Sequence, residues 1–135
     1  MSSPDNVQAA KEMYAAFNRG DLDGVMVHIA DEIQHLVPSL GEFPWGGTFE
    51  GRTAFRDRLA TLEEHFTIDQ FDQLHFLLGD GVVAVVSHIG TTLKKNGRSV
   101  TNVEFVQLLS FDDSGKCTRI SELYDPTESL AAWRK

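Results

Sequence analysis

From about residue 68 to residue 124 the sequence is a succession of β-type segments, rich in Val, Ile, Thr and Phe and divided by short turns. Asn96-Gly97 is the clearest hairpin turn, because both residues readily adopt positive φ angles. Residues 112–115, Asp-Asp-Ser-Gly, form the next turn. We therefore expect successive antiparallel strands. Their expected bounds are near 68–78, 81–94, 98–111 and 116–124.

The first half of the sequence carries apolar residues at helical spacing instead. This pattern predicts one helix that ends at Arg19-Gly20, a shorter second helix for which Asp21 can provide the N-cap, and a third from about Thr53. The apolar stripe of the second helix is Leu22, Val25, Met26 and Ile29. That of the third is Phe55, Leu59, Leu62 and Phe66.

Two short segments complete the expected fold. Ile33–Val37 alternates as a short strand and is followed by a Gly- and Pro-rich loop, residues 38–47. A last short helix begins at Asp125–Glu128, which is typical of a capping box. Helices first and antiparallel strands afterwards predict an α+β fold. In it, a curved antiparallel sheet wraps over the N-terminal helices, within a single domain that spans residues 1–135.

Charge and composition exclude several classes of partner. Twelve Lys and Arg against twenty Asp and Glu give a net charge of −8, which argues against nucleic acid and against anionic membrane surfaces. The longest apolar run, Val82–Val86, is far shorter than the roughly 20 residues that span a bilayer. The N-terminus does not have the pattern of a signal peptide. The single cysteine, Cys117, excludes an internal disulfide, and we expect a cytoplasmic protein.

The expected turns also predict which residues share a face of the sheet. A two-residue turn at Asn96-Gly97 places His88 opposite Phe105, and a four-residue turn at 112–115 places Phe105 opposite Glu122. The neighbouring row is Val86, Gln107 and Ile120. This face is mostly apolar, so we assign it to the interior. A slip of one residue at either turn would invert the assignment for one strand.

The opposite face of the expected sheet is also too apolar for open water. It consists of Val85, Ser87, Ile89, Glu104, Val106 and Leu108. An apolar face of this kind needs a second packed layer. The simplest layer is another copy of the same sheet, which predicts a homodimer.

Several segments together resemble the nuclear transport factor 2-like superfamily, in particular its SnoaL-like and ketosteroid-isomerase-like branch. They are Tyr14–Val25, Ala30–Glu32, Gly47–Arg52 and Glu122–Asp125. The resemblance covers nearly the whole chain. It implies a cone-shaped α+β barrel around an apolar pocket, and a homodimer formed through the outer face of the sheet. The scaffold hosts isomerases, cyclases, hydrolases and binding modules, so the resemblance does not identify the reaction.

Carried over position by position, the resemblance argues against a steroid isomerase. Val37 stands where those enzymes have the catalytic Asp. Met13 stands where they have the tyrosine donor, and Tyr14 is the next residue. Gln107 replaces their second donor, a protonated carboxylic acid, and retains only a neutral amide. Of the acid set of epoxide hydrolases on this fold, only Glu122, on the last strand, has a match.

Three residues are the candidates for acid–base chemistry. His35 shares the strand face of Val37 and could act as a base near neutral pH, or could be a core histidine bonded to a backbone carbonyl. Glu122 could be an acid with a raised pKa, or a structural ion pair with Arg98 or another base. His88 could be an acid partner, or could simply pair with Glu122. A metal site built from His35, His88 and Glu122 is the weakest alternative, because the sequence contains no close-spaced histidine motif.

Further residues are candidates for contact with a ligand. Gln107 could orient a carbonyl group or satisfy a helix end, and Trp45 could cover a pocket mouth or a partner. The complete set of expected ligand contacts is Met13, Tyr14, Phe17, Val37, Trp45, Phe105, Gln107 and Tyr124. We therefore expect a protein that binds a small apolar molecule in a conical pocket, with acid–base catalysis that needs no cofactor and no metal. The alternative is a non-catalytic binding or dimeric interaction module.

Overall fold

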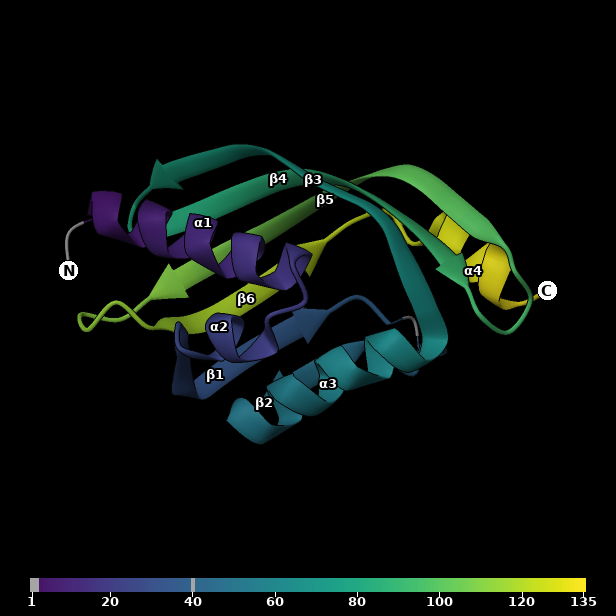
Figure 1. Cartoon of the computed structure of the whole chain (residues 1–135), viewed down its shortest axis with the longest axis horizontal. Coiled ribbons are helices and arrows are strands. Elements are labelled where there is room, and N and C mark those ends of the chain that lie inside the picture. The colour runs from purple at the N-terminus through teal and green to yellow at the C-terminus, as the bar shows by residue number, and fades with distance from the viewer. Residues whose placement is uncertain (1–2, 40) are drawn as a thin grey trace.

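The computed structural model describes residues 3–39 and 41–135, which form a curved sheet and four helices (Figure 1). Residue 40 of the expected loop lies outside this part. The helices are α1 (Ser3–Asn18), α2 (Leu22–Met26), α3 (Arg52–His65) and α4 (Thr127–Trp133). The strands are β1 (Ile29–Val37), β2 (Gly47–Glu50), β3 (Phe66–Gly79), β4 (Val82–Leu93), β5 (Ser99–Phe111) and β6 (Cys117–Leu123).

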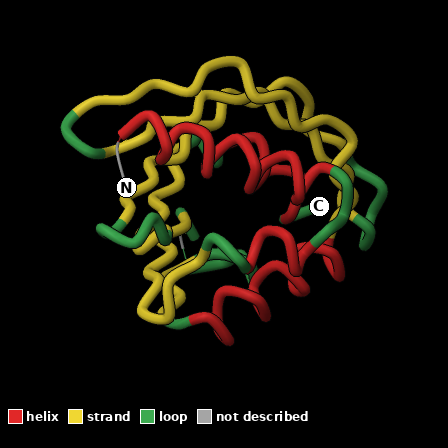
Figure 2. The backbone as a smooth tube through the Cα atoms, turned by 60° about the vertical axis from the view of Figure 1, so that its left-hand side comes forward, coloured by secondary structure: helices red, strands yellow, loops and turns green. Residues whose placement is uncertain are grey.

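The six strands form one sheet in the order β2-β1-β6-β5-β4-β3. All neighbours are antiparallel except β1 and β6, which run parallel. The sheet curves around the helices (Figure 2), with α1 packed on β3 and β4 and α3 packed on β1, β2 and β3. The expected α+β fold is confirmed, with the difference that the sheet stays unclosed, since β2 and β3 are its two edges.

The first half of the chain differs from the expected elements at two places. Asp21 caps α2 as expected, and its Oδ1 accepts a hydrogen bond of 2.9 Å from the Gly24 N–H. The helix ends at Met26, however, and Ile29 begins β1 rather than extending the stripe of α2. Gly47–Glu50, at the end of the expected loop and just beyond it, pairs with β1 as a short edge strand. Flanking glycines hide so short a strand from a pattern search.

The register between β4 and β5 corrects the predicted faces of β4. Near the hairpin Thr91 pairs with Val100, but farther along Ser87 pairs with Phe105 and His88 pairs with Glu104. The cause is an irregularity in β5 beside Ile89, where Asn102 has a φ of 55° and one extra residue enters the strand. The inward residues of β4 are therefore Val83, Val85 and Ser87, which are almost fully buried. The prediction that placed Val85, Ser87 and Ile89 outside was wrong.

The register between β5 and β6 differs from the prediction by two residues and therefore keeps every face. Gln107 pairs with Glu122, and Leu109 pairs with Ile120. Because side chains alternate along a strand, a shift of two residues returns each one to the same side. Phe105, Gln107 and Glu122 thus share the concave face, as the sequence predicted. Phe105 and Glu122 are buried there.

The buried apolar residues form two clusters, one between α1, α2 and the sheet and one beneath α4. The first includes Met13, Tyr14, Phe55 and Cys117. The second includes Trp45 and Leu62, with Trp133 packed against it. None of the helices in the described part of the chain is both long and apolar enough to cross a lipid bilayer.

Candidate functional site

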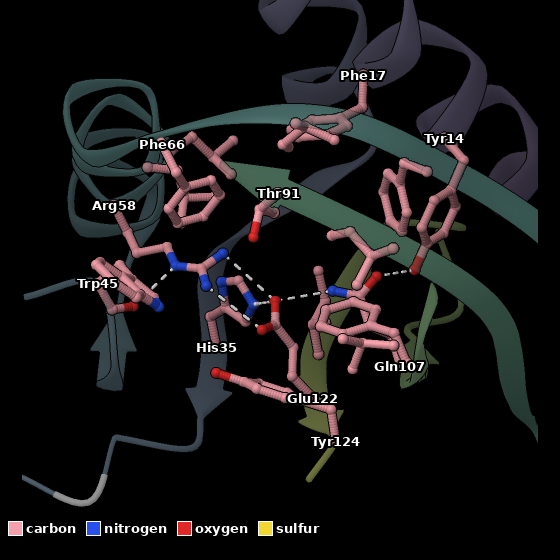
Figure 3. Close-up of a pocket in the computed structure, with 18 of the residues that line it drawn as sticks. Tyr14, Phe17, His35, Trp45, Arg58, Phe66, Thr91, Gln107, Glu122 and Tyr124 are labelled. Carbon is pink, nitrogen blue, oxygen red and sulfur yellow. Dashed lines mark hydrogen bonds and ion pairs between the residues drawn. The ribbon is translucent and has the colours of Figure 1, made fainter. Parts of the chain in front are cut away.

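A cavity of about 140 Å³ lies between the concave face of the sheet and the helices (Figure 3). Its walls are mostly aliphatic and aromatic, which is typical of a small-molecule site. Most of the candidate residues line it: Met13, Tyr14, Phe17, His35, Trp45, Phe105, Gln107, Glu122 and Tyr124. Two candidates do not. Val37 is buried on β1 away from the cavity, and His88 is on the convex face of β4.

His35 and Glu122 are in direct contact at the polar end of the cavity (Figure 3). The His35 Nε2 atom lies 2.8 Å from Glu122 Oε1, and both residues are at most 4% exposed. The parallel pairing of β1 with β6 creates this contact, because it places His35 beside Ile120, two residues before Glu122. A hydrogen bond from His35 to a backbone carbonyl was the alternative left open by the sequence. Its Nε2 atom contacts the Glu122 carboxylate instead, and its Nδ1 atom has no hydrogen-bond partner among the described residues.

The cation beside Glu122 is Arg58, which the sequence analysis did not select. Its Nη1 and Nη2 atoms lie 3.3 Å from the two carboxylate oxygens of Glu122. Its Nε–H donates to the main-chain carbonyl of Trp45 at 3.1 Å. Glu122 is thus an ion pair with a helix arginine and not with Arg98. The available signal was the position of Arg58 on the apolar stripe of α3, three residues after Phe55.

A chain of side-chain hydrogen bonds extends from Glu122 to helix α1. The Gln107 Nε2–H donates to Glu122 Oε1 at 2.9 Å, and the Tyr14 hydroxyl donates to Gln107 Oε1. Gln107 therefore orients the carboxylate and does not satisfy a helix end. Tyr14 is held as a donor, because burial, followed by the charge of Glu122, raises its pKa well above the usual 10.0.

Burial and neighbouring groups determine the protonation states of His35 and Glu122. Burial lowers the pKa of His35 from its usual 6.5, against the hydrogen bond and charge of Glu122 that favour protonation. Burial alone would raise the pKa of Glu122, but the Arg58 charge and the hydrogen bonds from His35 and Gln107 outweigh it and lower the pKa. At neutral pH the carboxylate is ionised and the imidazole is neutral. The neutral imidazole then carries its proton on Nε2, facing the carboxylate.

Aromatic rings in edge-to-face and tilted contacts form the wall beyond the polar end. Phe71 lies 5.8 Å from Tyr14, 5.7 Å from Phe17 and 5.9 Å from Phe105, as ring-centroid distances. Phe105 in turn lies 5.6 Å from Tyr124. These distances are typical of favourable aromatic pairs, so the wall is both apolar and well packed.

Trp45 and Thr91 also line the cavity. Trp45 is only 6% exposed and stacks on Phe43 with a centroid distance of 4.8 Å, so it is part of the wall. Thr91, another residue that sequence analysis did not select, directs its hydroxyl towards the group formed by His35, Arg58 and Glu122 (Figure 3). Within residues 3–39 and 41–135, no three His, Cys, Asp or Glu side chains gather in a way that could hold a metal ion.

Solved structures with the same fold include several bacterial proteins. An NTF2-like protein of Burkholderia xenovorans LB400 is 29% identical, with a TM-score of 0.83 over 99% of this chain and 97% of that one. A protein of Mesorhizobium loti called a SnoaL-like polyketide cyclase is 21% identical, with a TM-score of 0.74 over 92% and 100% of the two chains. A protein of Rhodopseudomonas palustris called an isomerase is 17% identical, with a TM-score of 0.75 over 93% and 92%.

The sequence comparison with families gives the stronger result. No curated protein matches the chain significantly. The model of the SnoaL-like domain matches residues 10–120, which include the whole sheet apart from the last three residues of β6. The matched range also includes the polar residues of the cavity except Glu122, Tyr124 and Ser129. With the fold and the cavity described above, this match places the protein in the SnoaL-like domain family, within the NTF2-like superfamily.

Proposed function

We propose that this protein binds a small, largely apolar molecule in the cavity and moves a proton on it without a cofactor. The reaction would be of the isomerase, cyclase or hydrolase type. The observation that carries the proposal is the 2.8 Å contact between His35 and Glu122 inside an apolar cavity. A buried charged network contributes little net stability compared with apolar packing, so its presence at a cavity wall favours a chemical role.

In the proposed mechanism His35 is the base. Glu122 accepts the Nε2–H of His35, which leaves the Nδ1 lone pair available for a proton from the ligand. The ionised carboxylate then stabilises the imidazolium, and Arg58 and Gln107 keep that carboxylate ionised and oriented. Glu122 therefore acts as the orienting group and not as the acid. His88, on the convex face, takes no part.

A non-catalytic binding module is the second candidate, and one feature favours it. The Glu122 carboxylate already accepts hydrogen bonds from His35, Arg58 and Gln107, and the His35 Nδ1 atom is buried without a hydrogen-bond partner among the described residues. A closed network of this kind can serve to hold the wall of a pocket in shape. Under this alternative, replacing His35 changes ligand affinity only.

The elimination reaction of 1,2-benzisoxazole separates the two candidates. It is a small, neutral, apolar molecule: a base removes the ring C–H proton, the N–O bond breaks, and 2-cyanophenolate forms, whose absorbance is measured. We expect His35→Gln to lose about a hundredfold in rate, whereas His88→Gln, the matched control on the opposite face, keeps the wild-type rate. The rate of the wild type should stay constant down to pH 6.5 and fall at lower pH, as the pH passes through the lowered pKa of His35. Equal rates for wild type and His35→Gln, with both proteins folded by circular dichroism, would refute catalysis.

We further propose that two copies of the chain associate through the convex face of the sheet. That face carries apolar side chains in adjacent rows on β4, β5 and β6: Ala84, Val86, Val106, Leu108 and Leu123. Leu123 is 51% exposed, which is unusual for a leucine in a sheet centre. Native mass spectrometry should show a dimer that Leu123→Asp disrupts. Val27→Asp is the control and should leave the dimer intact, because Val27 is similarly exposed but lies just after α2. A monomeric wild type would refute the proposal.

A further inference from the structure

The size of the cavity limits the ligand. The free space is about 140 Å³, close to the ~150 Å³ of an apolar cavity that accepts a benzene ring. A molecule of one ring with a small substituent fills such a space. A molecule with a second fused six-membered ring and a substituent exceeds this space.

The walls favour a planar ring. Tyr14, Phe17, Phe71 and Phe105 form a continuous set of edge-to-face and tilted contacts around the cavity. A planar conjugated ligand adds one more ring to this set in the same geometry. An aliphatic chain would fill the volume but would not form these contacts.

The polar end carries no net charge. The positive Arg58 and the negative Glu122 neutralise each other at 3.3 Å, and His35 is neutral at pH 7. Tyr14 and Tyr124 also face this end and remain protonated, because burial, followed by the charge of Glu122, raises the pKa of each. A charged ligand would lose its hydration without gaining a counter-charge, so the cavity favours a neutral one.

The unused hydrogen-bonding groups at this end are mostly donors. The Thr91 hydroxyl makes no hydrogen bond to any described side chain or main-chain atom and is directed towards His35, Arg58 and Glu122 (Figure 3). Arg58 has five N–H groups, of which three are used by Trp45 and Glu122. Free donors call for an acceptor on the ligand, such as a carbonyl oxygen.

We propose that the ligand is a neutral, planar, single-ring carbonyl compound and that Thr91 is the residue that recognises its oxygen. The inference rests on the proposed use of the cavity, but it concerns binding and stands independently of catalysis by His35. Thr91 is the specificity-determining residue because its hydroxyl is an unpaired donor that faces the cavity from β4 (Figure 3), whereas the unpaired Nδ1 atom of neutral His35 is an acceptor.

Four probes test the proposal by isothermal titration calorimetry. Acetophenone is the neutral carbonyl probe, ethylbenzene lacks the oxygen, benzoate carries a charge, and 2-acetylnaphthalene adds a ring. We expect benzoate and 2-acetylnaphthalene to bind at least about tenfold more weakly than acetophenone. Thr91→Val, which keeps the shape of the side chain, should weaken acetophenone about fivefold and leave ethylbenzene unchanged.

Thr92→Val is the matched control, because Thr92 is the next residue on β4 and its hydroxyl bonds to Asp69 and Ser99 outside the cavity. It should change neither affinity. Acetophenone binding that is absent, or equal in wild type and Thr91→Val, would overturn the proposal, as would benzoate binding as tightly as acetophenone. Thr91-dependent binding without benzisoxazole elimination would refute the proposed catalysis and leave this inference intact.

Discussion

Arg58 on α3 and Glu122 on β6 face each other across the polar end of the cavity, with both guanidinium Nη atoms 3.3 Å from the carboxylate oxygens. The helix packs on β1, and β1 lies beside β6, so the ion pair connects the helical layer to the centre of the sheet. The same carboxylate receives the imidazole of His35. The Glu122 carboxylate is therefore bound both by a residue of the sheet, His35, and by a residue of the helical layer, Arg58.

Removing the positive charge of Arg58 should strongly destabilise the folded protein. Arg58→Met leaves the Glu122 carboxylate buried without a counter-charge, so we expect a loss of about 3–5 kcal/mol in the free energy of unfolding. Urea titration at pH 7 measures it. The double variant with Glu122→Gln should recover part of the loss. Arg134→Met, which breaks the exposed pair with Glu42, is the control and should leave the urea midpoint nearly unchanged. Equal effects of the two arginine substitutions would contradict the buried role of Arg58.

Acidification should destabilise the protein in two steps. The pKa of His35 in the folded state is lowered from 6.5, so the unfolded chain binds more protons, and stability falls as the pH drops below 6.5. The pKa of Glu122 is lowered from 4.5, so its contribution is present above 4.5 and is lost as the pH falls through the folded value. Urea titrations from pH 8 to pH 2.5 measure both steps.

The variant His35→Gln isolates the first of these steps. Burial also lowers the pKa of His28, which adds a slope of the same sign to both proteins. The difference in the free energy of unfolding between wild type and His35→Gln should therefore be constant above pH 6.5 and should change with pH below it. A pH-independent difference between pH 7 and pH 5 would show that His35 is not titrating as described.

The single cysteine should be unreactive in the folded protein. Cys117 is fully buried, and burial raises the pKa of its thiol to about 12. Since the thiolate is the reactive form, only about one molecule in 10⁵ carries it at pH 7. Iodoacetamide should label Cys117 only in denaturant, and mass spectrometry detects the adduct. Rapid labelling of the native protein would show that the core around β6 opens readily.

The irregularity in β5 should depend on the residue at its left-handed position. Asn102 has a φ of 55°, which Asn and Gly adopt readily and β-branched residues do not. Asn102→Val should lower the free energy of unfolding by about 1–2 kcal/mol, whereas Asn102→Gly should change it far less. Urea titration of both variants makes the comparison. Equal stability of the two variants would mean that the backbone has rearranged to remove the irregularity.

Local patterns predicted the secondary structure well, because apolar periodicity reports directly on which face of an element is buried. The position of Glu122 and Gln107 on the concave face was also predictable. The predicted register between β5 and β6 was wrong by two residues, and a shift of two residues leaves each side chain on the same face of the sheet. His88 was misplaced for the opposite reason, since the extra residue in β5 is an odd shift that no turn motif announces.

The composition of the site depended on contacts between distant segments. His35 meets Glu122 only because β1 runs parallel to β6, a pairing that hairpin rules do not generate. Arg58 was not among the candidate residues chosen from the sequence, yet its side chain is only 6% exposed and pairs with Glu122. A charge on the apolar stripe of a helix is thus a signal worth following, but its partner becomes known only when the layers are placed together.

The extra residue near Asn102 has a consequence for how the chain tolerates change in length. Val100 and Phe105 are an odd number of positions apart, and both side chains are buried. A regular strand would send one of them to the outside, so the inserted residue restores the alternation. Deletion of Asn102 would therefore shorten β5 without turning any side chain over, whereas a deletion between Phe105 and Leu109 would expose half of the strand's core residues. Indels in related chains should accordingly gather at this one point of β5.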